Sequence, residues 1–300
     1  MTGCETSGLL QATSTLSMEA PALPTIIIPI HNAPDELNAC LASLHRNTPP
    51  EAEVLLLDDA SDDPFIRPML RHWLGEAGPT WRLEVLARNI GFVGTVNHGM
   101  EMTPGDVVLL NSDTVLTAGW LQGLHHCLAS DAAIATVTPW TNNGEIVSLP
   151  AFCRFNPLPV NLDEVARIIA ATGSADYPEI PTAVGFCMAI SRAAINQLGL
   201  FDQELFGLGY GEENDFCMRA RKAGWKNVLC DNVYVGHVGG SSFAPRGLGP
   251  DADSMKKLLS RHPEYLELIQ GFIAADPLSS RRKELTTALH RAGVIESGFA

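Results

Sequence analysis

The feature that most constrains the fold of this chain is a regular alternation of short aliphatic runs with longer segments of helical periodicity. Four of the aliphatic runs have the length of a buried strand and lie at residues 25–30, 54–57, 83–86 and 107–110. The segments between them repeat apolar residues at helical spacing, as in the stripe Leu37, Cys40, Leu41 and Leu44. Strands that alternate with helices in this way predict right-handed βαβ units, and therefore an α/β fold with a mostly parallel central sheet flanked by helices.

The second half of the chain is less regular and carries the domain boundary that we expect. Its predicted elements, in chain order, are strand 133–138, helix 161–171, strand 183–190, helix 213–223 and strand 228–235. Three further helices are predicted at 251–260, 263–275 and 281–292, which cap the sheet or pack against a partner. We therefore expect a disordered extension rich in Ser, Thr and Gly at 1–23, one α/β domain at 24–243 and a helical extension at 244–300.

The charge balance narrows the classes of partner. The chain has 20 basic and 34 acidic residues, so its formal net charge is −14. This argues against a nucleic-acid partner, because nucleic-acid binding relies on Lys and Arg that neutralise phosphates. The negative net charge is still compatible with an anionic small-molecule ligand, since a divalent cation supplies positive charge locally. The basic cluster Arg281, Arg282 and Lys283 is predicted to be a solvated helix face, with peripheral association to anionic lipid as the alternative.

The sequence predicts a protein without a membrane span or a secretion signal. The aliphatic runs fall far short of the roughly 18 apolar residues that a transmembrane helix needs. No Lys or Arg precedes Arg46, so the basic start of a secretion signal is missing. The seven cysteines form no Cys-x-x-Cys pair and are widely spaced, which argues against a zinc site or a disulfide framework. We therefore expect a reducing, cytoplasmic location.

Each predicted strand of the first half ends in polar side chains. These ends read, in chain order, His31-Asn32, Asp58-Asp59, Arg88-Asn89 and Asn111-Ser112-Asp113. Ligands of an open parallel sheet bind outside the carboxyl ends of its strands, so these four ends predict an acidic, hydrogen-bonding site along one edge. The alternative is that the Asp and Asn residues are ordinary turn residues and helix N-caps.

The residues after the first strand exclude two common nucleotide sites. The chain has no Gly-x-x-x-x-Gly-Lys-Ser/Thr phosphate loop, and His31-Asn32-Ala33-Pro34 stands where a dinucleotide site has Gly-x-Gly-x-x-Gly. Without a glycine cradle and with few cations, a bound diphosphate needs a divalent metal. Asp113 offers the hard oxygen ligand that Mg²⁺ or Mn²⁺ prefers.

Five segments and one histidine resemble family 2 glycosyltransferases. In chain order they are 25–32 (TIIIPIHN), 57–62 (LDDASD), 89–92 (NIGF), 108–114 (VLLNSDT), 211–219 (GEENDFCMR) and His237. The similarity covers about residues 25–243. It implies the GT-A fold, which is a single nucleotide-binding α/β domain with a mixed, mostly parallel sheet, and it implies a nucleotide-diphospho-sugar as the donor.

The resemblance implies that the donor is bound at the first strand ends. Pro29 and His31 fall where the family's first strand meets the nucleotide base, and Asp59 matches the residue that hydrogen-bonds the base. Asp58 matches a residue that braces the loop. Asn89 falls beside the ribose and the diphosphate.

The resemblance also implies a metal site. Asn111, Ser112 and Asp113 occupy the family's Asp-x-Asp motif next to the donor, and Asp113 matches its metal-binding carboxylate. His237 matches a histidine that completes the metal site in part of the family, so the implied cofactor is Mn²⁺ or Mg²⁺. The amide of Asn111 contributes no charge, which leaves metal-independent action as an alternative.

Two adjacent acids complete the implied site. Glu213 matches the carboxylate that serves as general base, and Glu212 beside it is assigned to donor binding. One base on the face opposite the leaving group supports a single displacement that inverts the anomeric centre. The alternative is that both acids only favour a helix start through the helix macrodipole.

Together these features predict an inverting, metal-assisted glycosyltransferase. We expect it to act in glycan or polysaccharide biosynthesis on a glycan or lipid-linked acceptor. The alternatives are a catalytically inactive nucleotide-sugar-binding module, which Asn111 motivates, and a nucleotidyltransferase, which the missing triphosphate loop disfavours.

Overall fold

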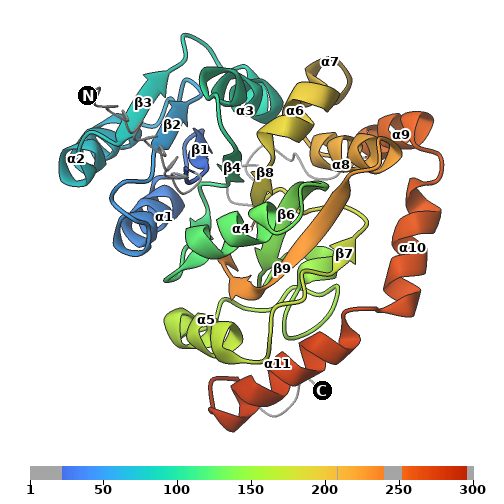
Figure 1. The fold of residues 1–300 in the computed structure, drawn as a ribbon. Helices are drawn as coiled ribbons and strands as arrows, with labels where there is room; N and C mark the ends of the chain where they lie inside the picture. The colour runs from blue at the N-terminus through green and yellow to red at the C-terminus, as the bar shows by residue number, and fades with distance from the viewer. Residues whose placement is uncertain (1–21, 208, 240–251, 296–300) are drawn as a thin grey trace, which may run out of the picture.

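A large mixed sheet forms the centre of the molecule and carries helices on both faces (Figure 1). The computed structural model describes residues 22–207, 209–239 and 252–295, so nearly all of the predicted extension 1–23 lies outside the described residues. Within these residues, eight strands pair in the order β3-β2-β1-β4-β8-β6-β9-β7. They are β1 (Thr25–Ile30), β2 (Val54–Asp58), β3 (Trp81–Val85), β4 (Val107–Leu110), β6 (Ile134–Trp140), β7 (Glu179–Ile180), β8 (Cys187–Ile190) and β9 (Lys226–Tyr234).

The pairing confirms the predicted α/β class. Strand β1 is parallel to β2 and β4, β2 is parallel to β3, and β6 is parallel to β9. Strand β8 runs antiparallel between β4 and β6, and β7 runs antiparallel to β9, so the sheet is mixed and mostly parallel. A separate antiparallel ladder joins β5 (Thr114–Val115) to β10 (Gly236–His237).

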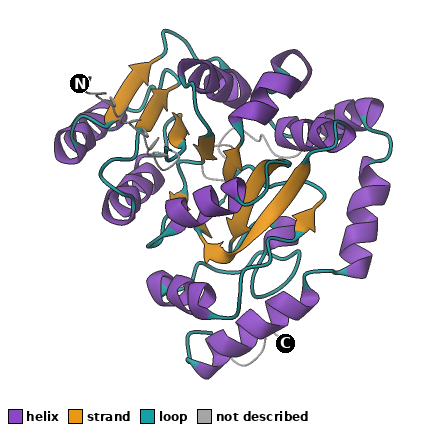
Figure 2. Ribbon diagram, viewed as in Figure 1, coloured by secondary structure: helices purple, strands orange, loops and turns teal. Residues whose placement is uncertain are grey.

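Helices cover both faces of this sheet (Figure 2). In the first half they are α1 (Pro34–Asn47), α2 (Ile66–Ala77), α3 (Gly91–Met102), α4 (Trp120–Ala129) and α5 (Leu162–Ala171), with a 3-10 turn η1 (Glu145–Val147) between the last two. In the second half they are α6 (Arg192–Leu198), α7 (Gln203–Phe206), α8 (Glu212–Lys222), α9 (Ala252–Arg261), α10 (Tyr265–Ala275) and α11 (Ser279–Arg291).

The alternation of side chains along β1 explains why the sheet has a core on each face. Ile26 and Ile28 are fully buried in the cluster that includes residues of α1, α2 and α4. Ile27, between them, is fully buried in the other cluster, which includes residues of α3 and α8. A strand that is buried on both faces is continuously aliphatic, which is the pattern that made this strand predictable.

Three predicted element bounds are wrong by several residues. Strand β3 covers Trp81–Val85 rather than 83–86, and the predicted strand 183–190 is a strand only over Cys187–Ile190. Helix α3 starts at Gly91, whereas the sequence pattern predicts a helix only over about residues 95–102. The early start has a tertiary cause, because the Asp59 carboxylate accepts hydrogen bonds from the backbone N–H groups of Ile90 and Gly91.

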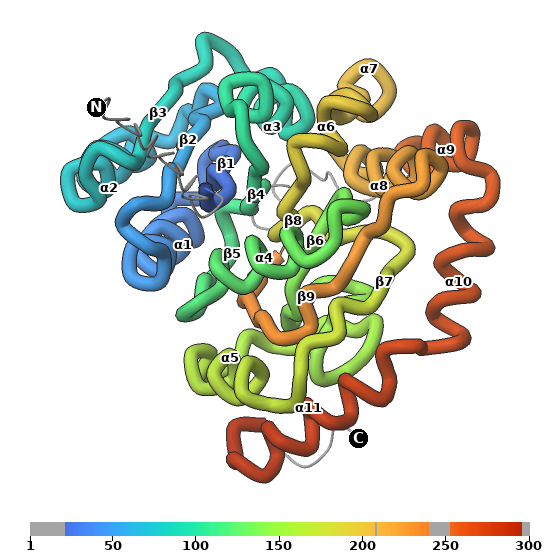
Figure 3. The backbone as a smooth tube through the Cα atoms, viewed as in Figure 1, coloured from blue at the N-terminus to red at the C-terminus, as the bar shows by residue number. Residues whose placement is uncertain are grey.

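The three C-terminal helices pack on the rest of the described chain. Helix α11 contacts α5, α9 contacts α7, and α10 runs between α9 and α11 along one side of the molecule (Figure 3). The interpretation of residues 281–283 as a solvated basic face is wrong for its first two members. Arg281 forms an ion pair with the buried Asp231 at 2.9 Å, and the guanidinium of Arg282 lies 4.1 Å from the centre of the Phe152 ring.

Two further observations concern the environment of the chain. Among the described residues, no helix is both long enough and apolar enough to cross a bilayer. The six cysteines in the described part of the chain are free, and five of them are buried.

Candidate active site

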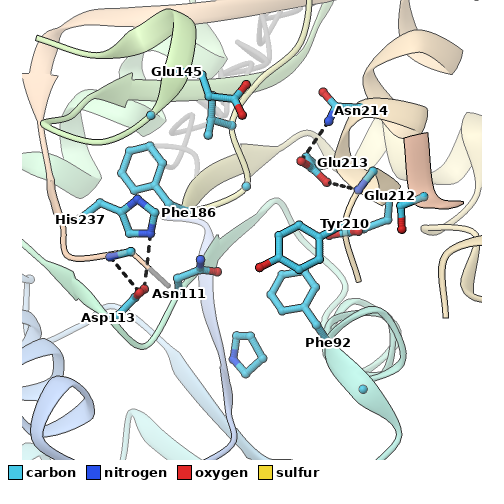
Figure 4. Close-up of a pocket in the computed structure, with 18 of the residues that line it drawn as sticks. Phe92, Asn111, Asp113, Glu145, Phe186, Tyr210, Glu212, Glu213, Asn214 and His237 are labelled. Atoms are coloured by element: carbon cyan, nitrogen blue, oxygen red, sulfur yellow. Dashed lines mark hydrogen bonds and ion pairs between the residues drawn. The ribbon is translucent and has the colours of Figure 1, made fainter. Parts of the chain in front are cut away.

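A pocket of about 670 Å³ opens at the carboxyl ends of β1, β2 and β4 (Figure 4). All ten residues predicted for the site line this one pocket, although more than 200 positions separate the first from the last. They are Pro29, His31, Asp59, Asn89, Asn111, Ser112, Asp113, Glu212, Glu213 and His237. The structure therefore brings every predicted site residue together, and their individual roles stay predictions.

The β1 and β2 ends form a tightly hydrogen-bonded corner. The Asp59 carboxylate accepts from the backbone N–H of Ile90 at 2.7 Å and from that of Gly91 at 2.9 Å. The His31 ring nitrogen Nδ1 lies 3.0 Å from the Asp59 carbonyl oxygen and 3.1 Å from the side-chain nitrogen of Asn89. Asp59 thus orients the start of α3, which holds the predicted donor-binding side chains of this corner in place.

Asp58 has the bracing role that the resemblance implies. Its carboxylate is completely buried and accepts a hydrogen bond from the backbone N–H of Ser61 at 2.9 Å. Arg67 of α2 lies 3.7 Å away as an ion-pair partner. Asp58 therefore fixes the turn after β2 and is turned away from the pocket, which it does not line.

The β5–β10 ladder joins the two predicted metal ligands. It pairs His237 with Thr114, the residue after Asp113. One oxygen of the Asp113 carboxylate accepts from the backbone N–H of Gly239 at 3.1 Å. The other oxygen lies 3.5 Å from the Nε2 atom of His237, and Figure 4 shows both side chains at one end of the pocket.

The surroundings of His237 fix the orientation of its ring. Its Nδ1 atom lies 2.7 Å from the carbonyl oxygen of Asn143, and the ring stacks on Phe186 with 5.0 Å between ring centres. Burial disfavours the charged imidazolium, but the hydrogen bond and the charge of Asp113, together with the Asn143 carbonyl, outweigh burial and raise the pKa of His237. An imidazole whose Nδ1–H donates to a carbonyl presents the Nε2 lone pair, which is the usual arrangement in a metal-binding histidine.

The donor set fits a divalent metal that the substrate helps to hold. The described residues contain no group of three or more His, Cys, Asp or Glu that could hold a metal. Asp113 and His237 supply one carboxylate and one imidazole, a combination that suits Mn²⁺. No Lys or Arg is among the described residues that line the pocket, so none of them neutralises a diphosphate bound there, and a divalent cation suits that role.

The first turn of α8 presents the two predicted acids. Gly211, with φ of 101°, turns the chain so that Glu212 and Glu213 begin the helix. One oxygen of the half-buried Glu213 carboxylate accepts from the backbone N–H of Gly211 at 3.2 Å, and the other accepts from the Asn214 side chain at 3.1 Å. Burial raises the pKa of Glu213, and the negative charge of Glu145 raises it further, against the backbone donors that lower it.

Glu212 differs from its neighbour in exposure. Its side chain is buried, and its Oε2 atom has no hydrogen-bond partner. Burial, and then the charge of Glu213, raise the pKa of Glu212 well above its ordinary value. The larger rise at Glu212 favours ionisation of Glu213 over that of Glu212, which is the order that a general base at Glu213 needs.

Sequence reasoning missed several residues that line the pocket. Glu145 lines it from η1 with φ of 49°, and the Phe186 ring stacks on the His237 ring (Figure 4). Residues of α9 and α10, among them Tyr265, close another side. No local pattern marked Glu145, because its orientation depends on a left-handed backbone conformation inside an irregular loop.

Comparison with known proteins identifies the family of this chain. The model described as Glycosyl transferase family 2 matches residues 25–199, which is more than half of the chain. This chain belongs to glycosyl transferase family 2. Two relatives of this family 2 glycosyltransferase are Uncharacterized protein Rv1525 of Mycobacterium tuberculosis and Uncharacterized protein Mb1552 of Mycobacterium bovis. Each is 25% identical to it over 229 residues, which cover 74% of this chain and 77% of the relative.

Solved structures of glycosyltransferases share the fold. GalNAc-T7, solved with UDP, GalNAc and Mn²⁺, superimposes with a TM-score of 0.60 and 17% sequence identity. The match covers 82% of this chain and 48% of GalNAc-T7, so this chain spans about half the length of that protein. The mannosyltransferase PcManGT from Pyrobaculum calidifontis, solved with GDP-Man and Mn²⁺, has a TM-score of 0.52 and 16% sequence identity. The match covers 91% of this chain and 75% of PcManGT. TarS 1-349 of S. aureus has a TM-score of 0.52 and 18% sequence identity, and the match covers 84% of this chain and 74% of TarS 1-349. This family 2 glycosyltransferase has the GT-A fold.

Proposed function

We propose that this glycosyltransferase moves a sugar from a nucleoside-diphosphate donor to an acceptor hydroxyl with inversion and with the help of a divalent cation. The observation that carries the proposal is the shared pocket, in which Glu213 of α8 faces the same cavity as the Asp113–His237 pair. A base and a site for the leaving group's charge are the two requirements of the reaction.

The donor is bound at the strand ends. Pro29, His31, Asp59 and Asn89 hold the nucleoside, while Asn111 and Ser112 lie beside the diphosphate. Two structures with this fold support such a donor, since GalNAc-T7 was solved with UDP and PcManGT with GDP-Man. The absence of lysine and arginine from the described lining residues supports a cation as the partner of the diphosphate.

Asp113 and His237 would hold the cation, which is Mn²⁺ or Mg²⁺. When bound, it stabilises the charge that grows on the leaving diphosphate. The Asn143 carbonyl keeps the His237 ring in the orientation that turns Nε2 toward Asp113, and the Gly239 N–H holds the second oxygen of that carboxylate. Mn²⁺ in both GalNAc-T7 and PcManGT supports this assignment.

Glu213 is the general base. The acceptor oxygen forms the new bond to the anomeric carbon, the bond from that carbon to the diphosphate oxygen breaks, and the nucleoside diphosphate leaves with the electron pair. The proton of the acceptor hydroxyl passes to the Glu213 carboxylate. A single displacement of this kind inverts the anomeric centre.

The wider setting is part of the same proposal. We place the protein in glycan or polysaccharide biosynthesis, in a reducing cytoplasmic compartment, with a glycan or lipid-linked acceptor. The catalytic domain covers 24–243, and the helical extension 244–300 contributes α9 and α10 to the pocket. A binding module without catalysis is the second candidate, because Asn111 lacks the charge of the full Asp-x-Asp motif.

A donor panel tests the proposal. The protein is incubated with nucleoside-diphosphate sugars, Mn²⁺ and hydroxyl acceptors, and released nucleoside diphosphate and the product's anomeric configuration are measured. We expect Glu213→Gln to lower kcat by about 10²–10⁴-fold, which is the usual contribution of a general base. The exposed Glu204 of α7 provides the control variant Glu204→Gln, which should keep its activity.

Each contrary result rejects a defined part of the proposal. Full activity of Glu213→Gln rejects the base, and a product with retained configuration rejects inversion. Calorimetric binding of nucleotide without turnover, across the acceptor panel, favours the inactive module. Pyrophosphate released from a nucleoside triphosphate and a sugar phosphate favours a nucleotidyltransferase.

A further inference from the structure

The side of the pocket formed by α9 and α10 is apolar apart from Ser254 of α9. Met255 and Leu258 of α9 and Tyr265, Leu266 and Ile269 of α10 line it. We call these five residues the apolar wall. Within the wall, Leu258 and Tyr265 are buried, whereas Met255 and Leu266 keep 37% and 39% of their surface exposed. Met255 and Leu266 thus expose hydrocarbon and line a pocket that the polar strand ends also line.

The apolar wall lines the same pocket as the candidate base. Tyr265 shares this pocket with Glu145 and Glu213, and burial, followed by the charges of these two carboxylates, raises the pKa of Tyr265. Asp215, two positions after Glu213 on α8, binds His262 in the corner between α9 and α10 at 2.9 Å. The contact therefore fixes the wall relative to α8, and the wall and Glu213 line one pocket.

The charges around the wall favour an uncharged occupant. Glu145, Glu212 and Glu213 line the same pocket, and the part of it that the structure describes contains no Lys or Arg. An acceptor group with a negative charge at the wall would share the pocket with these carboxyl groups, and no described lysine or arginine of the lining offsets their repulsion. An alkyl or aryl group avoids that repulsion and covers Met255 and Leu266.

Resting on the proposed transfer reaction, we propose that the apolar wall binds an uncharged hydrocarbon portion of the acceptor. The acceptor is then an amphiphile, in which the reacting hydroxyl is attached to an alkyl or aryl group, rather than an entirely polar glycan. The hydroxyl lies at Glu213 and the hydrocarbon extends along α9 and α10.

Calorimetric titration of the full-length protein tests this inference in the presence of a nucleoside diphosphate and Mn²⁺. The probes are methyl glucoside, octyl glucoside below its micelle concentration, and octyl phosphate. We expect octyl glucoside to bind at least about tenfold more tightly than methyl glucoside, since burial of two methylenes suffices for such a gain. Octyl phosphate should bind at least about tenfold more weakly than octyl glucoside because of its charge.

A pair of variants locates the effect. Met255→Gln combined with Leu266→Asn should abolish the preference for the octyl chain. Ile273→Asn is the matched control, because Ile273 lies on α10 with the same 39% exposure as Leu266 but does not line the pocket. It should keep the preference.

Any one of three results overturns the inference. The first is equal affinity of the wild-type protein for methyl and octyl glucoside. The second is an equal loss of octyl preference in the wall variant and in the control, and the third is octyl phosphate binding as tightly as octyl glucoside. The first comparison needs no variant, so it stands even where the wall variant fails to fold. Titration of the nucleoside diphosphate separates the two proposals. Octyl preference without nucleotide binding rejects the donor site alone, and nucleotide binding without octyl preference rejects the wall alone.

Discussion

The Nε2 atom of His262 lies 2.9 Å from the Oδ1 atom of Asp215, and both side chains are almost wholly buried. The Asp215 carboxylate also accepts hydrogen bonds from Arg219 of α8 at 2.8 Å and from Arg261 of α9 at 3.1 Å. Three donors from two parts of the chain thus meet at one carboxylate. This contact fixes α9 and α10 relative to Glu213, which lies on the same helix as Asp215.

Replacing Asp215 with alanine should destabilise the fold strongly. The change leaves His262 and two arginines without their shared carboxylate, and removal of one partner of a buried pair costs about 3–5 kcal/mol. Urea unfolding measures the loss. Asp253→Ala is the control, since Asp253 pairs with Lys257 on an exposed face of α9 and should cost less than about 1 kcal/mol. Equal losses in the two variants contradict the assignment.

The same contact makes the stability depend on pH. Burial disfavours the Asp215 carboxylate, but the hydrogen bonds from His262, Arg219 and Arg261, together with the charge of Arg219, outweigh burial and lower the pKa of Asp215. Because this pKa is lower in the folded than in the unfolded chain, the contact stabilises the fold above the ordinary aspartate pKa, and the stabilisation is lost as the pH falls through the lowered value. The difference in urea midpoint between wild type and Asp215→Ala should therefore shrink in acid. If the difference in urea midpoint stays constant from neutral to acid pH, the Asp215 contact is not the source of the pH dependence.

The donor side of the site could be predicted from local sequence. Strands β1, β2 and β4 are continuous aliphatic runs, and parallel strands place their carboxyl ends at one edge, so His31, Asp59 and Asn111 had to lie near one another. The prediction therefore required only the position at which each aliphatic run ends.

The acceptor side depends on tertiary contacts that leave little local signal. Strand β10 is two residues long, and the position of His237 depends on its pairing with Thr114. The helices α9 and α10 were predicted, but their place beside the pocket depends on the buried contact between His262 and Asp215. Helices α6 and α7 are too short for a helical period to be read.

Replacing Asp59 with asparagine should weaken both stability and nucleotide binding. An amide has one acceptor oxygen, so the N–H of Ile90 or of Gly91 loses its bond to this side chain. The Gly91 N–H keeps the Asn89 side-chain oxygen as a second acceptor, so the asparagine oxygen is needed at Ile90, and a lost hydrogen bond in this corner costs about 1–3 kcal/mol. Urea unfolding and calorimetric titration of nucleoside diphosphate measure the two effects. Asp35→Asn, at an exposed position of α1, should change neither. An unchanged nucleotide affinity in Asp59→Asn argues against its donor-binding role.

His237→Gln should remove most of the gain in nucleoside diphosphate affinity that Mn²⁺ provides. Loss of an outer partner of a metal ligand already costs about 10–100-fold in metal affinity, and we expect at least that for the ligand itself. Calorimetric titration with and without Mn²⁺ measures the gain, and His72→Gln on the exposed face of α2 is the control. A gain that persists in His237→Gln rejects the histidine as a ligand. No gain in the wild-type protein favours metal-independent action.

Glu145→Gln should shift the acid limb of the pH profile of kcat/KM to lower pH. Glu213 accepts a proton only when ionised, so the rate falls as the pH falls through the pKa of Glu213, which burial and the charge of Glu145 raise. Removing that charge leaves burial as the cause of the shift, and Glu213 then stays ionised in more acidic solution. Glu76→Gln, at an exposed position of α2, should leave the profile unchanged. If Glu145→Gln lowers the rate equally at every pH, Glu145 contacts a substrate and does not tune the pKa of the base. If Glu145→Gln and Glu76→Gln shift the acid limb alike, the effect arises from the net charge of the protein and not from the position of Glu145.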